Sequence, residues 1–155
     1  FSDLDFKPRD WLTLTSEMRY DIGNGHFRIA DHRATIAPED YWSLALGHRY
    51  VRTDPVFFPG AAGNNLFTSS FYYRINEDYA FRTRHAFEAR DGRMEEQYYT
   101  VYRDFRSWVG ALTFRVRDLR NGSQDYTIGV TFNLKAFPRY KLGQDRDEPA
   151  FLLGG

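Results

Sequence analysis

The feature that most constrains this chain is the strict alternation of apolar and polar residues near its C-terminal end. Tyr126, Ile128, Val130, Phe132 and Leu134 occupy one set of alternate positions. Threonine, glycine, asparagine and lysine fill the positions between and after them. Because successive side chains of a β-strand point to opposite faces, the pattern predicts a strand with one apolar and one polar face.

The same two-residue period recurs along most of the chain and predicts about nine strands. They are expected over residues 1–7, 12–20, 27–37, 42–50, 67–75, 79–87, 95–102, 108–118 and 125–137. In 27–37 and 95–102 the apolar and polar faces are hard to tell apart. The expected class is therefore all-β.

The connections between these strands alternate between two kinds. Tight turns are expected near 9–10, 38–40, 76–78 and 104–107, and longer or glycine-containing loops at 21–26, 53–65, 91–93 and 119–125. Asn24-Gly25, Asp91-Gly92 and Asn121-Gly122 are hairpin turn signals. Membrane barrels have short turns on one rim and longer loops on the other, so we expect an antiparallel up-and-down transmembrane β-barrel segment.

The predicted strands do not make a complete barrel. A complete barrel normally has an even number of strands, with both chain ends in the periplasm. About nine strands with the first starting at the outer rim would therefore form an incomplete barrel. We expect 1–138 to be the C-terminal strands of a longer barrel and 139–155 to be a periplasmic tail.

Composition narrows the class further. Aromatic residues make up 18% of the chain while the mean hydropathy is only −0.62, a combination that favours amphipathic strands. The 21 basic and 21 acidic residues cancel, which argues against a nucleic-acid partner. No apolar run approaches the roughly 18 residues of a membrane-spanning helix, and there is no cysteine. Aromatic residues expected at strand ends resemble an interfacial girdle: Trp11, Tyr20, Tyr41, Trp42, Tyr50, Tyr79, Trp108, Tyr126 and Phe137.

The candidate binding residues are charged side chains expected to face the barrel lumen. They are Arg74, Arg82, Arg84, Glu88, Arg115 and Arg117. A charged lining of this kind suits a polar, phosphorylated headgroup. Ordinary cross-strand charge pairing in a wet interior is the alternative, and it stays open at this point.

The sequence holds no pattern typical of catalysis, of a metal site or of a cofactor site. His26, His32, His48 and His85 lack the spacing of metal ligands, and no phosphate-binding glycine motif or nucleophile elbow occurs. We therefore expect no enzyme activity, no metal and no cofactor. His48 and His85 fall on stripes expected to face lipid, where they would need an interface or a partner.

The C-terminal third resembles the end of the outer-membrane lipopolysaccharide-assembly proteins of the LptD (OstA) family. The resemblance rests on the segments 97–104, 108–115 and 125–135, and 8–14 and 42–50 also read like strands of those barrels. Many members carry a cysteine pair just before the tryptophan strand. Phe105-Arg106-Ser107 stands at that place here, so a disulfide to an N-terminal domain is not expected.

The resemblance implies a protein of the bacterial outer membrane that inserts lipopolysaccharide into the outer leaflet. It also implies contact with outer-membrane lipids, an LptE-like plug lipoprotein and an LptA-like periplasmic bridge protein. The first and last strands of such barrels meet at a weak seam that opens sideways. The strand carrying Tyr126, Ile128, Val130, Phe132 and Leu134 would be one side of that lateral gate.

Two other functions fit the strand pattern. One is a different outer-membrane barrel, such as a porin or a lipid channel. The other is a soluble lipocalin-like barrel that binds an apolar ligand. The lipocalin-like barrel would turn its apolar stripes inward and would show no preference for aromatic residues at strand ends.

Overall fold

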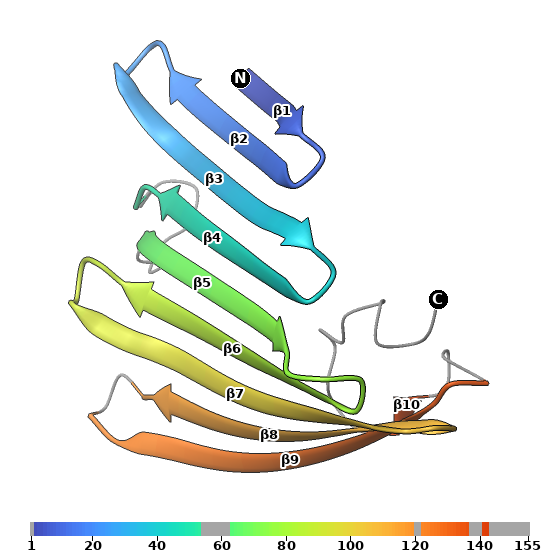
Figure 1. Ribbon diagram of the computed structural model, residues 1–155. Coiled ribbons are helices and arrows are strands. Elements are labelled where there is room, and N and C mark those ends of the chain that lie inside the picture. The colour runs from blue at the N-terminus through green and yellow to red at the C-terminus, as the bar shows by residue number, and fades with distance from the viewer. Residues whose placement is uncertain (1, 54–62, 120–121, 137–140, 143–155) are drawn as a thin grey trace.

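The computed structural model describes residues 2–53, 63–119, 122–136 and 141–142. Over these residues the chain forms one antiparallel sheet whose strands lie side by side in chain order (Figure 1). The strands are β1 (Ser2–Arg9), β2 (Leu12–Asp21), β3 (His26–Glu39), β4 (Trp42–Val51), β5 (Asn64–Arg74), β6 (Tyr79–Glu88), β7 (Arg93–Phe105), β8 (Trp108–Asp118), β9 (Gln124–Leu134) and β10 (Lys141–Leu142). The predicted class is confirmed: β1 to β9 form an up-and-down sheet that does not close on itself.

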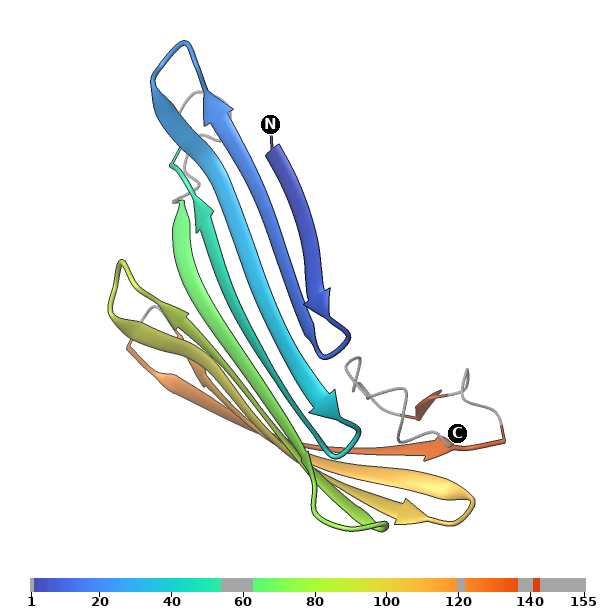
Figure 2. The same cartoon turned by 45° about the horizontal axis from the view of Figure 1, so that its top comes forward.

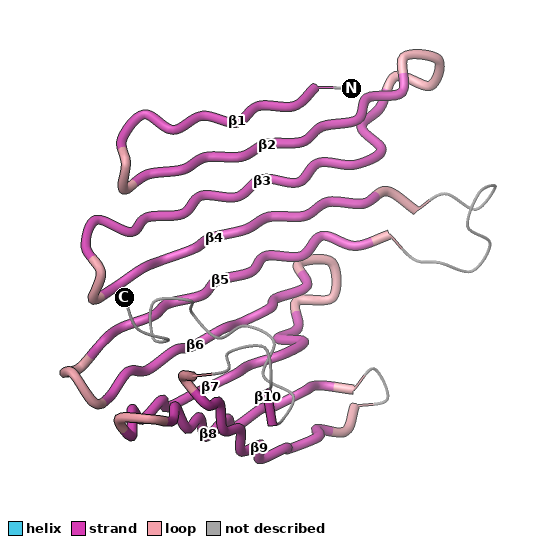
Figure 3. Tube along the Cα trace, turned by 90° about the vertical axis from the view of Figure 1, so that its right-hand side faces the viewer, coloured by secondary structure: helices cyan, strands magenta, loops and turns pink. Residues whose placement is uncertain are grey.

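The connections alternate between the two ends of the sheet as the sequence predicts (Figure 3). At the loop end, Gly25, Gly92 and Gly122 have φ values of 66°, 64° and 84°. This left-handed conformation is the one that Asn-Gly and Asp-Gly turns require. At the other end, two-residue turns join β1 to β2, β3 to β4 and β7 to β8. These two ends are called the loop end and the tight-turn end below.

Two strands whose faces are hard to read from sequence begin with a bulge. Arg19 and Tyr20 of β2 pair with Ile29 and Phe27, so Arg28 is an extra residue in β3. Ala86 and Phe87 of β6 pair with Glu96 and Met94, so Glu95 is extra in β7. Beyond these bulges the pairing is regular, and the faces are hard to read because polar side chains such as His32 and Gln97 lie on the apolar face.

The two faces of the sheet differ in chemistry. Paired residues share a face, so the register from β1 to β9 sorts every strand position into two sets. One set, the apolar face, holds all the large apolar side chains within strands that are exposed, from Leu4 on β1 to Phe132 on β9. The other set, the polar face, carries most of the charged residues and threonines of the strands.

Fully buried side chains are confined to the polar face. The buried side chains among the described residues all belong to it, and they are Tyr72, Ala80, Glu88, Thr100, Tyr102, Val109, Ala111, Thr131 and Asn133. The sheet is strongly curved (Figures 1 and 2). Side chains on the inner side of a curved sheet crowd together, whereas those on its outer side spread apart. The polar face is therefore the inner side over β5 to β9, where these residues lie.

The C-terminal strand differs from its predicted extent. β9 ends at Leu134 and not at residue 137, because the chain turns at Lys135 and Ala136. The Lys135 N–H donates to the Ser107 carbonyl, and its ammonium pairs with Asp104. The short strand β10 then pairs with β9 at Phe132 and Asn133, a pairing that the sequence did not predict.

Some predictions fall on residues outside the described part. They include 54–62 of the longest predicted loop, Phe137 of the aromatic set, and the predicted tail 139–155 apart from Lys141 and Leu142. In the described part of the chain, no helix is long and apolar enough to cross a membrane.

Candidate functional site

The predicted lumen residues all lie on the polar face. Register pairing puts Arg82 opposite Tyr72 and Thr100, and Arg84 opposite Ser70 and Tyr98. Arg74 pairs with Ala80, one step nearer the tight-turn end. Arg115 and Arg117 follow on β8, and Glu88 ends β6. The register therefore puts all six side chains on one face of the sheet.

Two of these arginines line a hollow with two more that sequence reasoning missed. Arg82 and Arg84 from β6 meet Arg33 of β3 and Arg49 of β4 around a depression of about 470 Å³. Asp31 is the one carboxylate among its lining residues. Arg33 and Arg49 form no ion pair with any described residue. We call this depression, with the four arginines around it, the arginine hollow.

Small side chains open the space in which the arginine hollow lies. Ala45 and Gly47 of β4 and Thr68 and Ser70 of β5 line its floor. A Cβ atom added at Gly47 would come within 2.4 Å of the Thr68 Oγ1. Because residue 47 has no side chain, the Thr68 hydroxyl can lie close to its backbone. The centre of the depression is therefore lined by small side chains, and the four longer arginine side chains lie around it.

The chemistry of the arginine hollow is that of an anion site. Four guanidinium groups face one carboxylate, and an arginine guanidinium binds phosphate or carboxylate oxygens with two parallel hydrogen bonds. The hydroxyls of Thr35, Thr68 and Ser70 add neutral donors. The site is wide and open, which suits a headgroup with more than one anionic group.

Arg115 and Arg117 lie outside the hollow and contact residues of the neighbouring strands. Arg117 Nε lies 3.3 Å from Glu96 Oε1, and Arg115 Nη2 lies 3.5 Å from Asp125 Oδ2 and 3.1 Å from Thr127 Oγ1. These contacts are cross-strand charge pairing, the alternative left open by the sequence. Because both pairs are partly exposed, each contributes about 0–1 kcal/mol.

Glu88 has a structural position. Its buried carboxylate accepts the backbone N–H groups of Asn65 at 2.9 Å and Arg90 at 3.2 Å. It thereby fixes the start of β5 against the β6–β7 hairpin. Glu88 does not line the arginine hollow.

The predicted gate residues lie on the apolar face of β9. Tyr126, Ile128, Val130 and Phe132 are all exposed there, while Leu134 is half-buried beside the turn. One edge of β9 pairs along its whole length with β8. Among the described residues its other edge pairs only with β10, at Phe132 and Asn133. Most of that edge therefore presents backbone groups that another strand can bind.

Within the described residues no group of three or more histidine, aspartate or glutamate side chains has the arrangement of a metal site. No model of a known protein family and no curated protein matches the chain.

Proposed function

We propose that this chain is part of an outer-membrane β-barrel of the LptD type, which moves lipopolysaccharide into the outer leaflet. The observation that carries the proposal is the distribution of side chains over the curved sheet. Large apolar side chains are exposed across one face, and buried polar and charged groups gather on the other. A barrel in a bilayer needs an apolar outside and tolerates a polar inside.

The same distribution argues against a lipocalin-like barrel. A soluble barrel that holds an apolar ligand turns its apolar side chains inward. Here the inner side of β5 to β9 carries Glu88, Thr100, Thr131 and Asn133 among its buried residues. The opposite face leaves Ile128 72% exposed and Leu112 52% exposed, which would be an unusually large apolar surface in water.

The arginine hollow supports an anionic substrate. Lipopolysaccharide carries phosphates on its sugars, and Arg33, Arg49, Arg82 and Arg84 offer the bidentate donors that bind them. On this proposal the open edge of β9 is one side of the lateral gate, an LptE-like lipoprotein plugs the lumen, and an LptA-like protein delivers substrate from the periplasm.

Membrane-depth labelling of the full-length protein tests the orientation of the sheet. Single cysteines carrying a polarity-sensitive probe replace Leu112, Phe114, Ile128 and Val130 on the apolar face, or Thr113, Arg115, Thr127 and Thr131 on the polar face. We expect the first set to report hydrocarbon and the second set to report water, because adjacent residues of a barrel strand face opposite environments.

The opposite result has a clear meaning. If the first set reports a dry protein core that does not respond to lipid, in a protein that is soluble without detergent, the membrane assignment fails. A soluble ligand-binding barrel then takes its place.

A further inference from the structure

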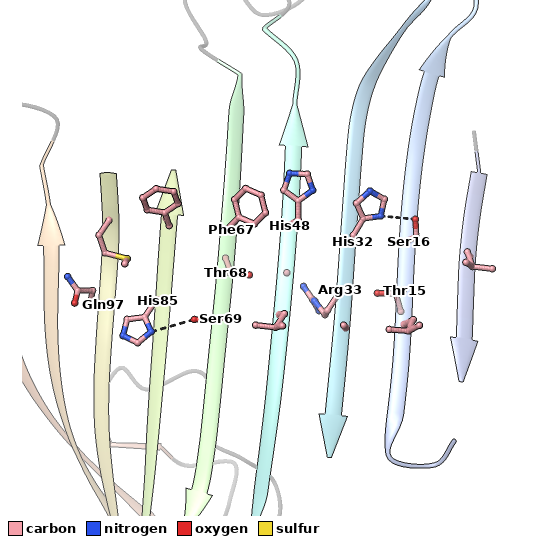
Figure 4. Close-up of a pocket in the computed structure, with 17 residues that line it drawn as sticks. Thr15, Ser16, His32, Arg33, His48, Phe67, Thr68, Ser69, His85 and Gln97 are labelled. Atoms are coloured by element: carbon pink, nitrogen blue, oxygen red, sulfur yellow. Dashed lines mark hydrogen bonds between the residues drawn. The ribbon is translucent and has the colours of Figure 1, made fainter. Parts of the chain in front are cut away.

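A group of polar side chains interrupts the apolar face between β2 and β7 (Figure 4). Its members are half-buried and neutral hydrogen-bonding residues at strand positions that elsewhere carry large apolar side chains. They are Ser16, His32, His48, Asn65, Ser69, His85, Gln97 and Tyr99. We call them the outer polar group.

Short contacts organise the outer polar group into two clusters. Ser16 Oγ lies 2.9 Å from His32 Nδ1, and His48 Nε2 lies 2.8 Å from Asn65 Oδ1. The rings of His32 and His48 stack with centroids 5.9 Å apart. The second cluster begins with Ser69 Oγ, which lies 3.5 Å from His85 Nδ1, and His85 Nε2 lies 3.3 Å from the Tyr99 hydroxyl.

These contacts leave hydrogen-bonding capacity unused. Among the described residues, no hydrogen bond involves His32 Nε2 or His48 Nδ1. A neutral imidazole has one donor and one acceptor nitrogen, so each ring still offers one of the two to a ligand. In hydrocarbon an unpaired polar group of this kind is unfavourable, which favours an occupant with polar atoms at this place.

The outer polar group lies in a shallow hollow that is otherwise apolar. The hollow measures about 840 Å³, within the range of small-molecule sites, and Leu14, Leu46, Phe67, Phe87 and Met94 line it. The only charged lining residue is Arg33, whose strand position belongs to the polar face. The charge of the hollow therefore matches a ligand that is apolar with neutral polar groups, and does not match a phosphate.

The position along the strands points to the lipid leaflet at the loop end. His48 lies three residues before Val51 at the end of β4, and His85 lies three residues before Glu88 at the end of β6. At about 3.3 Å per residue this is roughly 10 Å from the strand ends. The ester and amide linkages of an acylated lipid join its chains directly to its headgroup, at the interface that bounds the hydrocarbon layer near the strand ends of a barrel.

We propose that the outer polar group is a binding site, on the outside of the barrel, for the lipid A part of a lipopolysaccharide molecule. Its acyl chains occupy the hollow. His32 and His48 bind its ester or amide linkages, and the cluster around His85, at a similar distance from its own strand end, meets the hydroxyl groups that its acyl chains carry close to those linkages. The inference rests on the proposed membrane barrel, but it adds a site several strands away from the gate strand β9.

Lipid retention by the full-length protein tests the site. The protein is purified in detergent, incubated with purified lipid A or with diacyl phosphatidylethanolamine, and analysed by native mass spectrometry. We expect the wild type to retain lipid A in preference to the phospholipid. The double variant His32→Leu/His48→Leu should retain it at least about tenfold less, because it loses two hydrogen bonds to the lipid.

The substitutions are chosen so that folding does not limit the test. Leucine on a lipid-facing surface suits a barrel, which offsets the lost contacts to Ser16 and Asn65, so the double variant should still fold and insert. Thr83→Leu makes a similar change on the same face outside the hollow, and it should leave lipid A retention unchanged.

Equal retention of lipid A by the double variant, or a preference for phosphatidylethanolamine, overturns the site. A probe at residue 48 that reports a dry environment both with and without lipid also overturns the site. Such a result means that a protein partner covers the hollow. Failure of the proposed function has a different signature: probes at Ile128 and Val130 would not report hydrocarbon.

Discussion

Arginine in place of Val130 is expected to destabilise the folded barrel by about 2–4 kcal/mol, the cost of a cationic side chain on the lipid face near the bilayer midplane. Val130 lies in the middle of β9 on the apolar face and is 55% exposed. The matched change one residue earlier, Gly129→Arg, falls on the polar face. An added Cβ at Gly129 meets no atom within 4 Å, so we expect an effect below about 1 kcal/mol. The free energy of unfolding of the full-length protein in lipid vesicles measures both.

A third substitution, at a different depth in the membrane, provides the control for the changes at 129 and 130. Tyr126 belongs to the same apolar stripe but lies near the loop end of β9. Arginine at 126 should cost only about 0–1 kcal/mol, because a long cationic side chain near the interface reaches water. In a dry protein core both positions would be costly. Similar losses at 126 and 130, or a larger loss at 129 than at 130, would contradict the membrane orientation.

The strands could be predicted from sequence because the alternation of apolar and polar residues indicates both where a strand runs and which of its side chains share a face. In β8 and β9 no bulge interrupts the pairing, and the stripes of Leu112 and Val130 can be read directly. In β3 and β7 the stripes are hard to read, because polar side chains such as His32 and Gln97 lie on the apolar face. The turns at Gly25, Gly92 and Gly122 were predictable because their backbone conformation excludes most other residues.

The arginine hollow could be predicted only in part, since it depends on register. Alternation puts Arg82 and Arg84 on the polar face, but it cannot show that Arg49 lies near them across β5. The pairings of β4, β5 and β6 bring together residues more than thirty positions apart in the chain. Arg33 was also hidden by the ambiguous faces of β3. For the outer polar group the sequence contained one indication, namely that His48 and His85 fall on stripes of otherwise apolar residues.

Neutralising two arginines of the hollow is expected to weaken lipopolysaccharide binding by about 100-fold or more. In Arg82→Gln/Arg84→Gln, two charge-assisted hydrogen-bonding groups are lost, each worth about 1.5–3 kcal/mol, and every 1.4 kcal/mol is a tenfold change. Binding of fluorescent lipopolysaccharide to the full-length protein at fixed salt measures the loss. Transport of lipopolysaccharide to the cell surface should fall in parallel.

Two arginines outside the hollow provide the matched charge control. Arg115→Gln/Arg117→Gln removes the same charge from the same face, but these side chains do not line the hollow. We expect their loss to change binding by less than about tenfold, since the remaining effect acts through the screened field of the lumen. If both double variants weaken binding equally, net charge governs the interaction and the hollow is not a specific site.

A steric variant separates the shape of the hollow from its charge. Gly47→Leu keeps all four arginines but puts a side chain into the low centre that Gly47 leaves open, where even a Cβ meets the Thr68 hydroxyl. If phosphate groups enter the hollow, this variant should weaken binding by about tenfold or more while the protein still inserts into vesicles. If it binds as well as the wild type, the arginines act only from the rim and no headgroup enters between them.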